Sequence, residues 1–163
     1  MDIKVAPIEV DVTQVNKTWF ANRNIGKLKH YVVGIFQREG KAIIVAIPNN
    51  EPKTVADVIL KHISKGCTIY CESDVIPPSI RDYYKIHELG DGARSSGDVH
   101  INNVNNMWKD LKRQLKRTHV SVSQKHIQLY CAEVAWRINN RHLTPMEKFN
   151  KMLGLAVNVK VED

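Results

Sequence analysis

Residues 103–117 carry the apolar repeat that most constrains how this chain can fold. At 3.6 residues per turn, one face of a helix here would hold Val104, Trp108, Leu111 and Leu115. That stripe can bury against a core, so the segment is expected to be an amphipathic helix. An adjacent stripe, at offsets of 4, 7 and 11 from its first residue, consists of Asn105, Lys109, Lys112 and Lys116.

The same helix holds much of the positive charge of the chain. Residues 109–117 contain five basic residues and one acid, a net charge of +4 within a formal total of +7. A basic balance favours an acidic partner, and nucleic acid is the commonest one. The candidates for contacts with DNA phosphates are Lys109, Lys112, Arg113, Lys116 and Arg117. The alternative is an ordinary amphipathic helix with a solvated lysine face.

Composition favours one globular domain over residues 1–163. Hydrophobic content of 43% and charged content of 25% are ordinary for a soluble protein. The sequence contains neither an apolar run long enough to span a bilayer nor a signal-peptide pattern. Its three cysteines are expected to be free thiols in a reducing compartment, and no structural metal is expected. The protein is therefore expected inside the cell, and in the nucleus if its source is a eukaryote or a nuclear virus.

The order of predicted elements indicates the fold class. Strands are expected at residues 8–12, 31–37, 42–48 and 67–71. Helices are expected at residues 51–63, 79–84, 103–117 and 123–140, with a last helix capped by Thr144. Loops are expected at residues 15–29 and 86–98, and residues 157–161 would form an edge strand or a frayed end. Three antiparallel strands followed by a parallel strand, with flanking helices, predict an α/β mixed sheet of the ribonuclease-H-like type.

Three oxygen-bearing side chains occupy positions that such a sheet uses to bind divalent cations. Asp11 lies on the first strand, Glu72 ends the fourth, and Asn105 opens the helix that follows the glycine-rich loop. Two-metal phosphoryl transfer needs hard oxygen ligands around two Mg²⁺ ions about 3.5–4 Å apart. Acidic residues after strands are common, so this placement alone is weak evidence for a metal site.

Four sequence blocks resemble the catalytic domain of Merlin-type DDE transposases and their bacterial insertion-sequence relatives. IEVDVT at residues 8–13 is similar to V-E-V-D-E-T, and GCTIYCE at residues 66–72 is similar to G-x-x-I-Y-x-D. More specific are HINNVNNMWKDLK at residues 100–112, against H-x-N-x-I-E-x-x-W-x-x-L-K, and EVAWRIN at residues 133–139, against E-x-x-W-R-x-N. The resemblance covers roughly residues 8–153.

The resemblance implies descent from a DNA strand-transfer enzyme that depends on Mg²⁺ or Mn²⁺. Asp11, Glu72 and Asn105 would be the metal ligands, and Lys112 would hold a phosphate. Glu72 is one methylene longer than the aspartate of the pattern, and Asn105 is neutral where a DDE site has an acid. Two formal negative charges in place of three predict weaker metal binding, and a misplacement of about 1 Å can lower a rate about 10²-fold.

Two further expectations follow from the same resemblance. The first catalytic strand begins seven residues after Met1, so the N-terminal region with which relatives read the ends of DNA elements is expected to be absent. The expected partners are DNA and either a second copy of the chain or another protein, with no membrane. The alternative to an enzyme is a non-catalytic domesticated scaffold that binds nucleic acid or a protein partner.

Several other side chains have a structural and a functional interpretation. Trp108 and Trp136 fall on apolar helical stripes and are expected in the core. The aromatic pair at residues 19–20 would either contact nucleic acid or a partner, or pack locally. His100 would reach a phosphate or the metal site, or else cap the helix. Arg137 is expected to pair with the glutamate one turn earlier on its own helix.

Overall fold

The computed structural model describes residues 6–16, 29–90, 95–118, 122–123 and 125–157. Its strands are β1 (Ile8–Asn16), β2 (Lys29–Gln37), β3 (Ala42–Ile47), β4 (Thr68–Glu72), β5 (Lys85–Leu89), β6 (Ser95–Ser96) and β7 (Val99–His100). Its helices are α1 (Pro52–His62), the 3₁₀ helix η1 (Pro78–Tyr83), α2 (Asn102–Thr118), α3 (Ile127–Asn139) and α4 (Pro145–Val157).

Five strands form one mixed sheet in the order β3-β2-β1-β4-β5. β1, β2 and β3 are antiparallel, whereas β4 runs parallel to β1 and β5 parallel to β4. A separate two-stranded ribbon of β6 and β7 precedes α2. The predicted ribonuclease-H-like α/β sheet, with three antiparallel strands and then a parallel one, is therefore confirmed.

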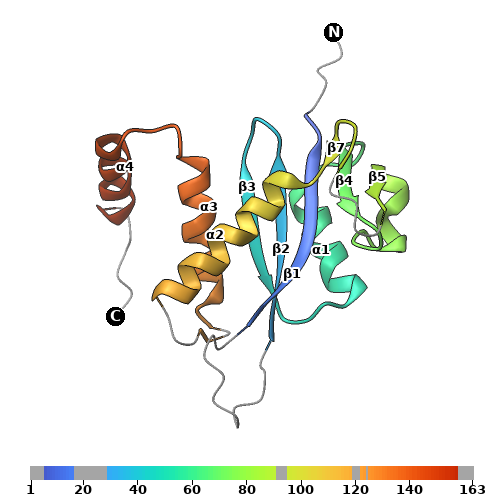
Figure 1. Cartoon of the computed structure of the whole chain (residues 1–163). Coiled ribbons are helices and arrows are strands. Elements are labelled where there is room, and N and C mark those ends of the chain that lie inside the picture. Colours follow the sequence, from blue (N-terminus) through green and yellow to red (C-terminus); the bar gives the residue numbers. More distant parts are fainter. Residues whose placement is uncertain (1–5, 17–28, 91–94, 119–121, 124, 158–163) are drawn as a thin grey trace.

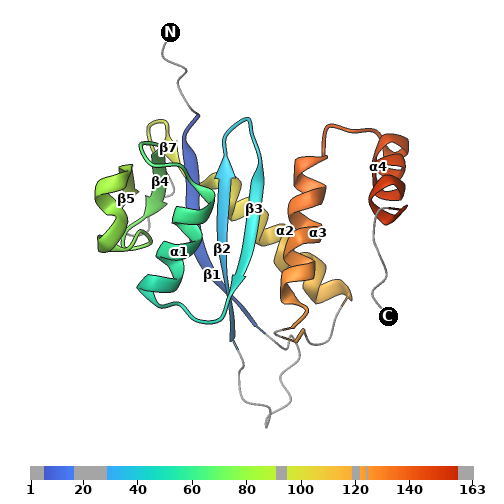
Figure 2. The same ribbon diagram turned by 180° about the vertical axis from the view of Figure 1, so that it is seen from behind.

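Helices cover both faces of this sheet (Figures 1 and 2), and the side-chain alternation of the strands assigns a core to each face. On one face, α2 and α3 pack on β1, β2 and β3 through a cluster that includes Val32, Phe36 and Leu111. On the other face, α1 and the segment around η1 pack on the sheet through a cluster that includes Val10 and Ile69. Glu9 and Asp11 alternate with Val10, so their side chains face α2.

Gly34 on β2 allows α2 to lie close to the sheet. It pairs with Asp11 of β1, and a Cβ atom at this position would lie 2.5 Å from the indole Cη2 of Trp108 and 2.7 Å from the Met107 methyl group. Any larger residue would push the helix outward. The glycine therefore sets the depth at which the indole lies beside Asp11.

Several element boundaries differ from the sequence expectation. β1 and β2 extend to residues 16 and 29, because their pairing continues beyond the apolar stretch into the polar one. Residues 86–89, expected as loop, belong to β5, whose apolar residues Ile86 and Leu89 do not alternate. Its stability comes from pairing with β4, and local patterning cannot reveal that. α3 begins at Ile127, since residues 123 and 126 form a hydrogen-bonded turn before it.

The two tryptophans have different environments. Trp108 is buried in the α2 core as expected, with 5% of its surface exposed. Trp136 is only half-buried and belongs to neither apolar cluster, so its expected place in the core was wrong. It lies two residues after the buried Val134, about 200° further around the helix, and thus outside the apolar stripe that Val134 belongs to. The aromatic pair at residues 19–20 and the tail after residue 157 lie outside the described residues.

α4 is set apart from the sheet, beyond α3 (Figure 1). Its predicted cap is present: Thr144 N donates to Glu147 Oε2 at 2.7 Å, and Glu147 N donates to Thr144 Oγ1 at 3.3 Å. The helix has no buried residue. Within the described part of the chain, no helix is both long enough and apolar enough to cross a membrane.

Candidate functional site

A fully buried glutamate on β1 holds the first turn of α2. Glu9 Oε2 accepts hydrogen bonds from the backbone N–H groups of Asn103 at 2.9 Å and Val104 at 3.2 Å. Glu9 Oε1 accepts from Asn103 Nδ2 at 2.8 Å and from Arg38 Nε at 3.0 Å, and His100 Nδ1 lies 3.4 Å away. The first N–H groups of a helix lack partners within it and carry partial positive charge, so a carboxylate there caps the helix.

Arg38 joins this carboxylate to the segment that leads into α2. Its two terminal nitrogens donate to the carbonyl oxygens of Asp98 and His100, each at 3.0 Å. The guanidinium also lies over the Tyr70 ring of β4, 4.7 Å from its centroid. These contacts fix the beginning of α2 against β1 and β4. His100 therefore lies where its capping interpretation placed it, and its Nδ1 is 3.4 Å from the backbone nitrogen of Asn102.

Two residues after Glu9, Asp11 presents the second carboxylate of β1 to α2. Trp108 Nε1 donates a hydrogen bond to Asp11 Oδ2 at 2.7 Å. Burial raises the pKa of Asp11 above its usual value, although the Trp108 hydrogen bond, the backbone N–H of Val12 and the charge of Lys112 each act to lower it. The indole thus has two roles, since it fills the core and also orients the carboxylate.

A cavity of about 640 Å³ opens between β1 and the exposed flank of α2. It is lined by Asp11, Thr13, Asn102, Asn105, Asn106, Trp108, Lys109 and Lys112. Lys112 Nζ lies 3.4 Å from Thr13 Oγ1, which directs the ammonium group toward β1. Three of the four residues expected to form a catalytic site therefore line one cavity. We call it the Asp11 cavity.

Glu72, the fourth expected site residue, does not line the Asp11 cavity. It is an exposed residue at the end of β4 and pairs with Leu89 of β5. The last paired residues of β1 and β4 are Glu9 and Tyr70, and Asp11 and Glu72 each lie two residues further along parallel strands. The two carboxylates are consequently level with each other and on the same face of the sheet.

The donor set decides which cation would suit this region. Asp11 and Glu72 supply carboxylate oxygens and Asn105 an amide oxygen, all ligands that hard cations such as Mg²⁺ and Mn²⁺ prefer. Among the described residues, no group of three or more His, Cys, Asp and Glu side chains could hold a metal ion. Asn105 is neutral, so it adds no negative charge at the position where an acid would. Two lysines in the cavity oppose a cation further, so the residues fit a weakly held divalent ion.

The basic residues of α2 separate onto two flanks. Lys109 and Lys112 line the Asp11 cavity, whereas Arg113 and Arg117 line a groove between α2 and α3. Lys116 is exposed and lines neither of these hollows. The five candidates for DNA contact therefore lie on both sides of the exposed ridge of α2, with Lys116 between the two groups.

Sequence reasoning missed Glu9 and Arg38 as the residues that hold α2. The sequence did carry a signal for Glu9. It lies between apolar residues of a strand, and a glutamate that becomes buried there needs a hydrogen-bonding or ion-pair partner. No local signal marks Arg38, which follows β2 at a turn. The expected pair of Arg137 and Glu133 is present, with Arg137 donating to Glu133 Oε1 at 2.7 Å.

Residues 6–139 match the family described as ISXO2-like transposase domain. The match covers β1 to α3, and therefore every element that contributes to the Asp11 cavity. No match was found among curated proteins.

Proposed function

This chain belongs to the family of ISXO2-like transposase domains, and from that membership we propose that it is a DNA-binding domain whose Asp11 cavity receives a phosphodiester of the DNA backbone. The observation that carries the proposal is the cavity lining. Asp11 from β1 and Asn105, Lys109 and Lys112 from α2 line one hollow of about 640 Å³. Two ammonium groups there would neutralise a phosphate, which needs no base-specific contact.

The same cavity supports a proposal about metal. Asp11 and Asn105, with Glu72 from the neighbouring strand, would hold a divalent ion, and Mg²⁺ or Mn²⁺ would suit their oxygens. A bound ion would stabilise negative charge on the attacking and leaving oxygens of the phosphodiester. The role of Lys112 would be to hold a non-bridging phosphate oxygen, and the Trp108 hydrogen bond would keep the Asp11 carboxylate in one orientation.

A second function, a non-catalytic DNA-binding scaffold, is favoured by one feature of Asp11. Its Oδ2 already accepts the Trp108 hydrogen bond, which competes with a metal ion for that oxygen. The third ligand position is the neutral Asn105. Both features would remain compatible with phosphate binding, because removing negative charge from the cavity favours an anion.

Asp11→Asn tests the two functions with little change of shape. The asparagine Oδ1 can still accept the Trp108 hydrogen bond, so the variant removes charge while it keeps the packing. If the domain is an enzyme, millimolar Mn²⁺ should support nicking of supercoiled plasmid by the wild type, and the variant should lose it. If it is a scaffold, neither protein should nick, and the variant should bind duplex DNA at least as tightly as the wild type.

Lys109→Gln/Lys112→Gln is the companion variant for the DNA proposal itself. It should weaken duplex binding and lower the slope of log K against log salt by about 0.9 for each phosphate that the protein no longer neutralises. A matched control is Lys53→Gln/Lys61→Gln on α1, which removes two charges on the opposite face of the sheet. Equal weakening in both variants would mean that the Asp11 cavity has no special role in binding DNA.

A further inference from the structure

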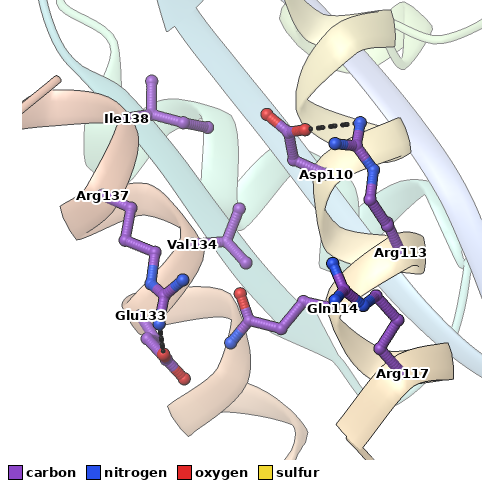
Figure 3. A pocket seen from close by; sticks show the side chains of 8 residues that line it. All are labelled: Asp110, Arg113, Gln114, Arg117, Glu133, Val134, Arg137 and Ile138. Carbon is purple, nitrogen blue, oxygen red and sulfur yellow. Dashed lines mark hydrogen bonds and ion pairs between the residues drawn. The ribbon is translucent and has the colours of Figure 1, made fainter.

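The groove between α2 and α3 combines an apolar floor with charged walls (Figure 3). It has a volume of about 560 Å³, and Val134 and Ile138 of α3 form its apolar part. Three guanidinium groups reach it from two helices: Arg113, Arg117 and Arg137. We call this hollow the arginine groove. It lies on the flank of α2 opposite to the Asp11 cavity, and the two share no lining residue.

Two of these arginines are held by acids of their own helices. Arg113 donates to Asp110 Oδ1 at 3.0 Å, and Arg137 donates to Glu133 Oε1 at 2.7 Å, each within one helical turn (Figure 3). The two arginine side chains are 63% and 65% exposed. Exposed pairs of this kind contribute little to stability, so a stronger anionic partner can replace the carboxylates.

Arg117 supplies the third guanidinium. Within the described part of the chain it has neither an ion pair nor a hydrogen-bonding partner, although it lines the groove. A guanidinium presents its N–H groups in a planar fork that matches two oxygens of a phosphate. One unpaired guanidinium group beside two weakly paired ones can bind the phosphates of a phosphodiester chain.

We propose that the arginine groove is a second DNA-backbone site, in which Asp110 and Glu133 compete with phosphates for Arg113 and Arg137. The exposed Lys116 lies on the same helix between the lysines of the Asp11 cavity and the arginines. A polymer with regularly spaced phosphates can cross α2 and contact both flanks, which a single free phosphate cannot do. This favours nucleic acid over a small anion.

The inference rests on the proposed function only in taking DNA as the partner. It needs no metal ion, and the variants that test it change no residue of the Asp11 cavity. Its test therefore uses metal-free binding, whereas the catalytic hypothesis is tested by Mn²⁺-dependent nicking. Failure of one leaves the other intact.

The sharpest test is a gain of affinity. Asp110→Asn/Glu133→Gln releases both paired arginines and should bind a short fluorescent duplex about threefold to fivefold more tightly than a control of equal charge, the factor that corresponds to two released exposed pairs. The control is Glu51→Gln/Asp57→Asn at α1, on the other face of the sheet. Fluorescence anisotropy at low salt measures both variants. A purely structural role for the two acids predicts no difference from the control.

The complementary test removes the arginines. Arg113→Gln/Arg117→Gln/Arg137→Gln should lower the salt slope by about 0.9 for each phosphate that is no longer neutralised, hence by up to about 2.7. A control that removes the same charge at distant exposed positions is Lys53→Gln/Lys61→Gln/Lys85→Gln. An unchanged salt slope in the arginine variant, or an equal change in the control, would overturn the proposal.

Inorganic phosphate distinguishes a free anion from DNA as the ligand. If the groove binds DNA, phosphate should compete with the duplex no better than its ionic strength predicts. If calorimetry instead shows phosphate binding that the arginine variant abolishes, while duplex binding stays unchanged, the ligand is a small phosphate and the DNA proposal is wrong.

Discussion

Replacing Glu9 by glutamine tests whether the buried carboxylate is what holds α2 on the sheet. Its oxygens accept four hydrogen bonds, two from Asn103, one from Val104 and one from Arg38. In one orientation, the NH₂ group of a glutamine would face Arg38 Nε and Asn103 Nδ2. In the other it would face two backbone N–H groups. Either orientation sets donors against donors, so about two hydrogen bonds are broken.

The expected loss of stability follows from burial and charge. Removing one partner of a buried ion pair destabilises a protein by about 3–5 kcal/mol, because the other charge stays buried without compensation. Arg38 is 18% exposed and keeps two carbonyl acceptors, so we expect the lower end, about 3 kcal/mol. Against a total free energy of unfolding of about 5–15 kcal/mol, this change is readily measured.

Urea unfolding followed by tryptophan fluorescence gives the free energy of unfolding of each variant. Glu133→Gln is the matched control, since it makes the same chemical change in an exposed pair on α3 and should destabilise by only about 0.3–0.5 kcal/mol. Amide exchange of Asn103 and Val104 should accelerate in the Glu9 variant alone. A destabilisation below about 1 kcal/mol for Glu9→Gln would refute the capping argument.

Three further predictions concern other parts of the fold. Gly34→Ala should destabilise the protein by about 1–3 kcal/mol in the same assay, because its methyl group would overlap Trp108; an unchanged midpoint would contradict this. Burial raises the pKa of the Cys71 thiol to about 12, so a thiol reagent should label the partly exposed Cys67 first and reach Cys71 only on unfolding, as mass spectrometry would show. Hydrogen bonds from the N-cap threonine lower the pKa of Glu147, so its contribution to α4 is present above the unfolded pKa and is lost as pH falls through the folded value; an ordinary pKa by NMR titration would disprove the cap in solution.

The functional residues show which features of the candidate site can be predicted from sequence patterns. The four blocks in the sequence predicted the family, which the match over residues 6–139 confirms. The same blocks predicted that Asp11, Asn105 and Lys112 belong to one site, and in the structure all three line one cavity. The expected metal site itself, with Glu72 as a ligand, stays a prediction.

The sequence by itself determined those helices and strands whose hydrophobic repeat follows from local backbone geometry. Repeats of 3.6 and of 2 residues are fixed by helix and strand geometry, so they predicted α2 and the strand β1. Glycine at position 34 carried no such local signal. Its meaning depends on Trp108, which approaches from another element.

Tertiary structure decided the roles of the two carboxylates on β1. Both are acidic, two residues apart and on the same face, yet Glu9 caps α2 whereas Asp11 opens onto a cavity. Glu9 and its partner Asn103 are 94 residues apart, and the depth at which α2 packs on the sheet brings them together. The same packing divides the basic residues of α2 between two hollows, because α3 lies along one flank of the helix and β1 along the other. A pattern along the chain carries no information about which neighbour covers which flank.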